Sequence, residues 1–145
     1  MCRLGLNIVL FSIIAVLSLA CSSKEKEPDV HAFWKDFRQA VIANDKNAVL
    51  EMVRFPFEVR GPTDAEPVRH LDRQQFLLIY AKLLSQPVYL PESDKVVSRS
   101  MRELIVAKPV LDPSNLLTPA MVRFYQFEFT TVDGRWFFTR AFLEE

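Results

Sequence analysis

Glycine is scarce in this sequence of 145 residues, which contains only three, at positions 5, 61 and 134. Loops that cradle phosphate in nucleotide-binding proteins need clustered glycines, so this distribution excludes P-loop and Rossmann-type sites. Cysteine is equally rare, and both cysteines, Cys2 and Cys21, lie within the first 21 residues. The rest of the sequence therefore has no disulfide and no thiolate for a zinc site or for nucleophilic catalysis.

A net charge is also missing, because 18 Lys and Arg residues balance 18 Asp and Glu residues. Without a basic excess, we expect no nucleic-acid partner. The two histidines, His31 and His70, have no clustered carboxylate motif beside them, so we expect neither a metal site nor a bound cofactor. Half of the residues are hydrophobic, which excludes a disordered polar chain, and the length suits one domain.

The first residues have the pattern of a secretory signal peptide. Arg3 is followed by an uncharged, mainly apolar stretch that ends in the small residue Ala20. The ending Leu19-Ala20-Cys21 resembles the bacterial lipobox, in which the cysteine becomes the first residue of the mature protein and carries acyl chains. We therefore expect a lipoprotein signal peptide at 1–20, a lipidated Cys21 in a flexible tether at 21–28, and one domain at 29–145. An uncleaved membrane anchor and a soluble secreted protein are the alternatives.

The resemblance to lipoproteins also predicts a location. Two or three acyl chains hold a protein on a membrane far more firmly than one chain does. Ser22, rather than Asp, follows the cysteine, which resembles outer-membrane passengers among enteric lipoproteins. We expect a lipid-anchored protein of the bacterial cell envelope, on the outer membrane and facing the periplasm.

Two helices are expected at the start of the domain. Asp29 can cap a helix that runs to the break at Asn44-Asp45, because apolar residues recur there at helical spacing. Asp45 can cap a second, short helix that reaches Val53. The side chains that should face the core are Val30, Phe33, Trp34, Phe37, Val41, Val49 and Met52.

A third helix has the clearest start. Asp72 and Gln75 have the spacing of a capping box, and Leu71 can pack on Phe76 across the cap. Pro87 closes the helix. Its core-facing side chains should be Phe76, Ile79, Tyr80 and Leu83.

Alternating or short apolar runs predict the strands. Pro56 and Pro62 indicate that the first of them lies at a sheet edge, where a missing N–H is harmless. Prolines also mark a long loop at 107–120, which could cap a pocket or contact another protein. The expected strands are 55–60, 68–70, 101–106, 120–132 and 135–143.

The dipeptide Asp133-Gly134 predicts a tight hairpin between the last two strands, because such a turn needs positive φ at both positions. Alternation then places the aromatic side chains and Arg140 on one face, against the helices, and polar side chains on the other. The expected pairs are Thr131 with Trp136, Phe129 with Phe138, Phe127 with Arg140, and Tyr125 with Phe142. The polar face should carry Gln126, Glu128, Thr130, Arg135 and Thr139.

The order of these elements, the Asn44-Asp45 break and the hairpin at Trp136 resemble the nuclear transport factor 2-like superfamily over residues 29–145. That superfamily includes ketosteroid isomerases and SnoaL-type cyclases. The resemblance implies an α+β fold in which three N-terminal helices pack on a curved, mostly antiparallel sheet and form a cone around a pocket. The isomerases use inward Asp and Tyr residues. Tyr80 and Tyr125 could face a cavity, but no inward Asp accompanies them, so the resemblance gives no catalytic residue.

Arg140 is the most informative candidate, because a charge on the aromatic face is costly unless it is paired. It could anchor a carboxylate ligand among Trp136 and Phe127, or it could pair with an acid such as Asp36 or Glu51. We favour the ion pair, because charged residues that face a core are usually paired. The residues expected to line a ligand pocket are Arg140, Tyr125, Phe127, Trp136 and Tyr80.

The sequence favours binding over catalysis. A histidine beside a carboxylate can act as a general base, but Asp72, near His70, is used as a helix cap, and no third orienting group is visible. We expect a membrane-tethered, non-enzymatic domain that binds a small ligand or an envelope protein. The alternatives are an isomerase or cyclase that uses the cone pocket, and an accessory or immunity-type factor that binds protein.

Overall fold

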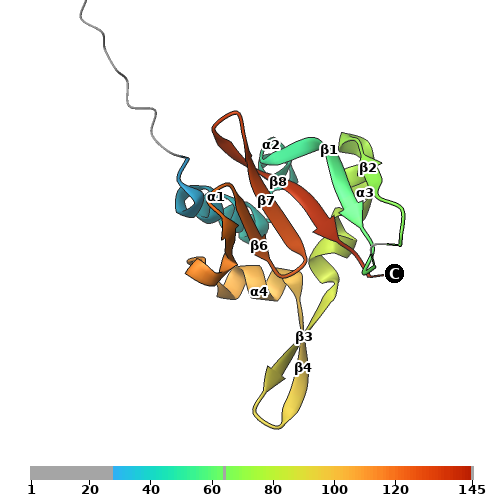
Figure 1. Cartoon of the computed structure of the whole chain (residues 1–145), viewed down its shortest axis with the longest axis vertical. Helices are drawn as coiled ribbons and strands as arrows, with labels where there is room; N and C mark the ends of the chain where they lie inside the picture. The colour runs from blue at the N-terminus through green and yellow to red at the C-terminus, as the bar shows by residue number, and fades with distance from the viewer. Residues whose placement is uncertain (1–27, 64, 145) are drawn as a thin grey trace, which may run out of the picture.

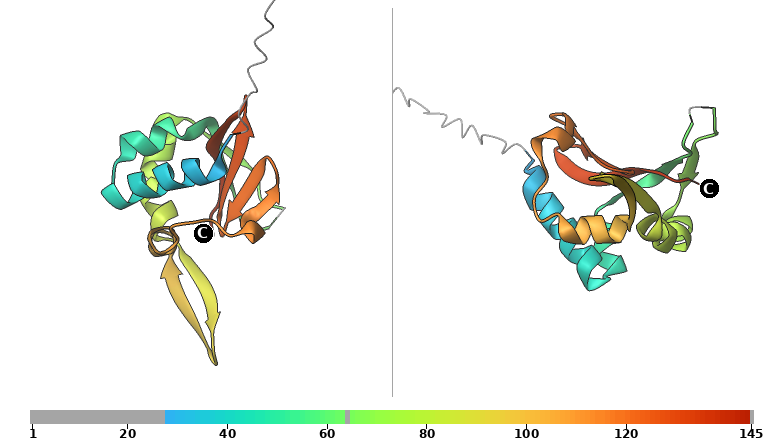
Figure 2. Two further views of the ribbon diagram at one scale, coloured as in Figure 1. Left: turned by 90° about the vertical axis from the view of Figure 1, so that its left-hand side faces the viewer. Right: turned by 90° about the horizontal axis from the view of Figure 1, so that it is seen from below.

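The structure is a computed structural model that describes residues 28–63 and 65–144. It is an α+β fold in which helices lie against one face of a curved sheet and a two-stranded arm projects away from the body (Figures 1 and 2). The expected signal peptide, Cys21 and most of the tether lie outside the described residues. Within the described part of the chain, no helix is long and apolar enough to cross a membrane.

The first two helices confirm their predicted caps. The Asp29 side chain accepts hydrogen bonds from the backbone N–H groups of His31 and Ala32, and starts helix α1 (Val30–Ala43). Helix α1 ends at Asn44, whose φ of 55° is left-handed. Asp45 then accepts from Ala48 N–H and starts α2 (Lys46–Glu51). At the Asn44-Asp45 break, the C-cap of α1 is therefore followed directly by the N-cap of α2. We call this the joint between the two helices.

The other two helices both begin with a capping box. In α3 (Arg73–Ser85) the box is Asp72 with Gln75, as predicted. In α4 (Met101–Ala107) it is Ser100 with Glu103. The predicted strand at 101–106 is therefore wrong, because the capped apolar run forms a helix with Met101, Leu104 and Ile105 buried. Residues 28–63 and 65–144 form four α-helices, and the fourth does not belong to an N-terminal group.

The main sheet has six strands, in the order β2-β1-β8-β7-β6-β5. All neighbours are antiparallel except β1 and β8, which are parallel. The second predicted strand forms one residue later than expected. The strands are β1 (Val53–Arg60), β2 (Arg69–Leu71), β5 (Leu116–Thr118), β6 (Met121–Phe124), β7 (Phe127–Val132) and β8 (Arg135–Phe142).

Two expectations about these strands are wrong. Strand β1 is not an edge strand, because β2 and β8 flank it. It tolerates Pro56 because its pairing with β8 is irregular between Val53 and Glu58, and its pairing with β2 begins only at Phe57. The predicted long strand at 120–132 is a hairpin of β6 and β7. In the long loop before it, a short 3-10 helix (Pro113–Asn115) precedes β5.

The Asp133-Gly134 turn is confirmed, with φ values of 49° and 72°. Thr131 pairs with Trp136, and Phe129 with Phe138, as predicted. Beyond them the register shifts, so that the remaining predicted pairs are wrong. Phe127 faces Ala141, and Glu128 faces Arg140.

The shift is a β-bulge in which Thr139 is the extra residue of β8. Its hydroxyl donates to the backbone oxygen of Glu128 at 3.3 Å. Because one extra residue reverses the alternation, Arg140 moves from the predicted aromatic face to the polar face. Phe142 moves with it, and lies within 4.6 Å of the Arg123 guanidinium, measured to the ring centroid.

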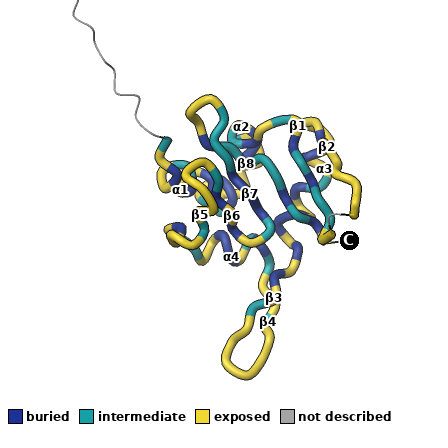
Figure 3. Tube along the Cα trace, in the orientation of Figure 1, coloured by how far each residue is buried: buried dark blue, intermediate teal, exposed yellow. Residues whose placement is uncertain are grey.

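Aromatic rings fill the space between the helices and the sheet. Phe37, Phe57 and Phe138 are fully buried, and the centroid of Phe138 lies 5.5 Å from that of Phe37 and 4.7 Å from that of Phe57. Phe76 of α3 contacts Phe57 at 4.8 Å. Such pairs stabilise a core by about 0.5–1.5 kcal/mol each beyond the burial itself. Buried positions follow α1 and the central strands, whereas the arm is largely exposed (Figure 3).

The arm is a separate two-stranded sheet of β3 (Pro87–Glu92) and β4 (Lys95–Ser100). Every residue of β3 has a partner in β4, from Pro87 with Ser100 to Glu92 with Lys95. A hydrogen bond from Met101 N–H to Gln86 O, 3.1 Å long, closes the root. The arm therefore joins α3 to α4, and its far end extends beyond the helices (Figure 1).

Candidate functional site

The five residues expected to line one pocket lie in different places. Phe127 is fully buried in the core. Trp136 is also buried, and its indole N–H donates to the backbone oxygen of Pro28 at 2.9 Å. Tyr125 is 43% exposed in the turn between β6 and β7. Tyr80 and Arg140 lie in two further sites, on opposite sides of the molecule's main sheet.

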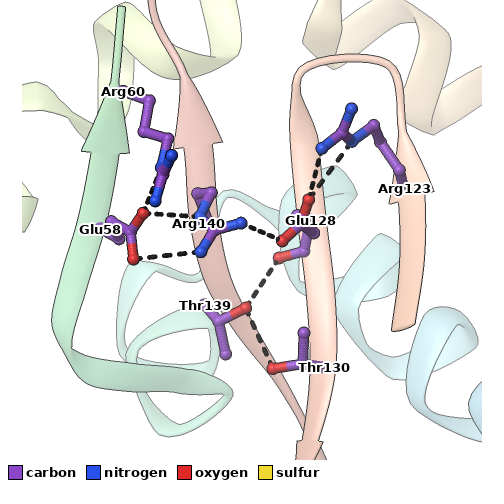
Figure 4. Close-up of polar contacts among 7 residues, drawn as sticks. All are labelled: Glu58, Arg60, Arg123, Glu128, Thr130, Thr139 and Arg140. Atoms are coloured by element: carbon purple, nitrogen blue, oxygen red, sulfur yellow. Dashed lines mark hydrogen bonds and ion pairs between the residues drawn. The ribbon is translucent and has the colours of Figure 1, made fainter. Parts of the chain in front are cut away.

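Arg140 belongs to a row of charged side chains on the helix-free face of the sheet (Figure 4). Its Nε donates to Glu58 Oε1 on β1 at 2.8 Å, and its Nη1 donates to Glu128 Oε1 on β7 at 2.7 Å. Arg123 on β6 donates to the other oxygen of Glu128, also at 2.7 Å. Arg60 donates to Glu58 from the other side. We call these five residues the charge row.

The charge row neutralises its own acids. The Glu128 side chain is only 1% exposed, yet each of its oxygens accepts from a different arginine. Burial works to raise the pKa of Glu58, but the hydrogen bonds and charges of Arg140 and Arg60 outweigh it and hold that pKa below its ordinary value. The preferred ion-pair interpretation of Arg140 thus has physical partners, although they are neither Asp36 nor Glu51. The bulge explains why, since it turns Arg140 toward the opposite face.

The histidines lie apart from one another. His31 is exposed in the first turn of α1, and His70 is exposed on β2 opposite Glu58. Asp72 receives the backbone N–H of Gln75, so its carboxylate is used as a cap. Within residues 28–63 and 65–144, no group of three His, Cys, Asp or Glu side chains could hold a metal ion.

Tyr80 lines a pocket of about 500 Å³ at the ends of the helices, which we call the helix-end pocket. It lies where the joint between α1 and α2, the second half of α3 and the start of α4 meet. One wall is apolar, with Ala81 and Leu84 beside the Tyr80 ring. The full lining is Asn44, Lys46, Tyr80, Ala81, Leu84, Ser85, Ser100 and Arg102.

Two observations define the chemistry of this pocket. Arg102 donates to the backbone oxygens of Val41 (2.8 Å) and Ile42 (3.3 Å), the final turn of α1, which fixes its guanidinium at the pocket. Burial raises the pKa of Tyr80 to about 12, although the charge of Arg102 works against this. The phenol therefore keeps its proton at neutral pH, and the pocket offers hydrogen-bond donors and positive charge.

The arm has one uncharged, exposed face, which we call the arm face. Alternation places Tyr89, Pro91, Val96 and Ser98 together on it, because Tyr89 pairs with Ser98 and Pro91 with Val96. Tyr89 is 64% exposed and Val96 is 68% exposed. The charged residues of both strands lie on the other face, where Arg99 binds Glu92 at 3.0 Å.

Sequence reasoning missed Lys46, Arg102 and the arm face, and the last two were missed for one shared reason. Once 101–106 is taken as a strand, the chain between the third helix and that strand has no element of its own. Ser100 and Glu103 have the same three-residue spacing as Asp72 and Gln75. That signal would have predicted α4 and thereby a helix-to-helix connection long enough for a hairpin.

Comparisons of the chain with models of protein families, with curated protein sequences and with solved structures find no match.

Proposed function

We propose that this chain is a non-enzymatic, lipid-anchored domain of the bacterial cell envelope that binds another envelope protein through the arm face. The lipobox-like ending at Cys21 supports the anchor, and the residue after it supports an outer-membrane position facing the periplasm. The balanced charge of the chain supports a protein partner rather than nucleic acid.

The single observation that carries the proposal is the exposed, uncharged face of the arm, which projects beyond a root where Val88 and Leu90 pack against the core. A lone two-stranded hairpin is marginally stable in water, so a projecting one needs a reason to persist. Aromatic residues are enriched in protein interfaces and charges are depleted at their centres. The arm face has this composition, with Tyr89 and Val96 exposed and the charged residues turned away. Its partner should present an uncharged, apolar patch.

The filled interior argues against the isomerase and cyclase alternative. An enzyme of that kind needs an enclosed pocket with a titratable group tuned for its reaction. Here Phe37, Phe57 and Phe138 occupy the space that a cone pocket would need. We still propose a distant kinship with the nuclear transport factor 2-like superfamily, supported by helices over a curved sheet. The filled core, α4 and the arm would be this chain's departures from the cone.

Site-specific photo-crosslinking tests the proposal. A benzophenone amino acid replaces Tyr89 on the arm face, and in a control it replaces Leu78 on α3, which is 84% exposed. We expect one discrete crosslinked product in cells from position 89 and none of that mass from position 78. A second substitution, Val96→Asp, should abolish the product, whereas Val110→Asp, at an exposed site off the arm, should not.

Three outcomes would overturn this proposal. Equal products from positions 89 and 78 would mean non-specific contact, and no product would mean no partner. A product with the mass of two copies of this chain would mean that the arm face binds a second copy of the chain and not another envelope protein.

A further inference from the structure

We propose that the helix-end pocket binds a small molecule that combines an apolar body with a single anionic group. This inference rests on observations separate from those on the arm face.

The pocket concentrates positive charge without a built-in counter-charge. Lys46 and Arg102 both line it, and no acidic side chain does. In the described part of the chain, neither cation forms an ion pair with a carboxylate. The nearest acids in the sequence, Asp45 and Glu103, act as helix caps. An anion in the pocket would therefore meet two cations.

A second observation comes from Tyr80. Its side chain is almost completely buried, with 2% exposure, and it lines the pocket. Within residues 28–63 and 65–144 its hydroxyl makes no hydrogen bond. The hydroxyl is not among the buried polar atoms that lack a partner, so it is open to water and can be reached by a ligand. The Tyr80 pKa of about 12 keeps the phenol protonated at neutral pH. The hydroxyl can therefore donate a hydrogen bond to an oxygen of a ligand.

The remaining lining sets the class of ligand. Ala81, Leu84 and the Tyr80 ring form an apolar wall, so a bare inorganic anion would leave much of the pocket unused. A volume of about 500 Å³ is within the range of small-molecule sites. A charge-assisted hydrogen bond from a guanidinium suits a carboxylate or a phosphate. The geometry points to compact, apolar monoanions, of which aromatic carboxylates are the simplest.

Calorimetric titration with 2-naphthoate tests the inference, using the full chain in lipid nanodiscs and subtracting the heat of empty nanodiscs. The neutral 2-naphthamide has the same apolar body without the charge, and acetate has the charge without the body. We expect 2-naphthoate to bind at least tenfold more tightly than either, because hydrogen bonds to charged groups and apolar burial each contribute.

Variants locate the binding. Lys46→Gln should weaken the binding of 2-naphthoate about three- to tenfold and leave that of 2-naphthamide unchanged, because only the first ligand is charged. Tyr80→Phe should weaken the binding of both ligands, about three- to tenfold for 2-naphthoate, because each offers an oxygen to the hydroxyl. Arg102→Gln should weaken it more, with a thermal melt to confirm folding, since Arg102 also joins α4 to α1. Lys35→Gln removes an exposed cation of α1 outside the pocket and should change nothing. Equal affinity for the anion and the amide, no binding of 2-naphthoate, or unchanged binding in both Lys46→Gln and Tyr80→Phe would overturn the inference.

Discussion

At position 140 a guanidinium lies between carboxylates from two neighbouring strands, β1 and β7. Its three hydrogen bonds to Glu58 and Glu128 run across the sheet at 2.7–3.2 Å. Glu128 has almost no contact with water, so it depends on its arginines for charge compensation. A buried pair of this kind is costly to break, because without Arg140 the buried Glu128 would be left with Arg123, and Glu58 with Arg60, as cationic partner.

Arg140→Met should destabilise the domain by roughly 3–5 kcal/mol, the usual cost of breaking a buried pair. The methionine keeps most of the apolar stem but leaves Glu58 and Glu128 without their shared donor. Urea unfolding measures the change. Arg135→Met is the matched control on the same strand, since Arg135 is exposed and should change stability by no more than about 0.5 kcal/mol. A higher melting temperature for Arg140→Met would show that the charge strains the fold.

Glu58 gives the charge row a dependence on pH. The folded-state pKa of Glu58 lies below the ordinary value of 4.5, so folding stabilises the ionised carboxylate relative to the protonated one. The resulting stability is present above pH 4.5 and is lost as the pH falls through the folded pKa. Glu58→Gln should cost about 1–2 kcal/mol at pH 7, because its arginine partners are partly exposed.

Unfolding curves from pH 7 down to pH 2 measure the difference between Glu58→Gln and the unaltered protein. That difference should shrink steadily below pH 5. Glu51→Gln, which removes an exposed partner of Arg73, serves as the control and should cost less than 1 kcal/mol at pH 7. A constant difference across this pH range would mean that the charge of Glu58 contributes nothing to the free energy of unfolding.

At the scale of elements, short sequence motifs predicted the starts of α1, α2 and α3 correctly, because a helix start depends on residues that are close in the sequence. Asp29, Asp45 and Asp72 start their helices as expected, because a cap satisfies backbone groups within three residues of itself. In the segment 101–106, Met101, Leu104 and Ile105 have helical spacing, so this period and the cap at Ser100 both indicate a helix, and the predicted strand overlooked them.

The bulge at Thr139 could not be predicted in this way. Its effect is to bring Arg140 between acids on β1 and β7, and Glu58 is 82 residues away in the sequence. The parallel pairing of β1 with β8 is equally non-local. The hairpin turn was predictable and the register beyond it was not, so the candidate ligand residues were assigned to one pocket instead of several sites.

Gly134→Val tests the turn that sets the start of this register. Gly134 has a φ of +72°, and an added Cβ would meet no atom within 4 Å. The expected loss of about 1–3 kcal/mol would therefore come from backbone strain, not from a clash. Gly134→Asn should lose less, because Asn tolerates this conformation. If Gly134→Val melts at the same temperature as the unaltered protein, the turn does not constrain the hairpin.

At the scale of the whole molecule, we propose that membrane attachment and recognition belong to different parts of the chain. The equal numbers of basic and acidic residues give the chain no net charge with which to hold an anionic membrane surface. The proposed attachment would then depend on the lipid expected at Cys21, and it would leave the arm face and the helix-end pocket available for partners. A tether of a few polar residues would keep both near the membrane, within reach of other envelope proteins.

Cys21→Ala should therefore release the protein from the membrane fraction, because it removes the sulfur that would carry the diacylglyceryl group. Cys2→Ala is the matched control. It removes the other cysteine from the same N-terminal segment and should leave the protein in the membrane pellet after a high-salt wash. Mass spectrometry of the unaltered protein should find Cys21 as the first residue, with two or three acyl chains attached. If Cys21→Ala stays in the washed pellet like the unaltered protein, the lipid is not the anchor. Release of both variants and of the unaltered protein would instead indicate a soluble secreted domain.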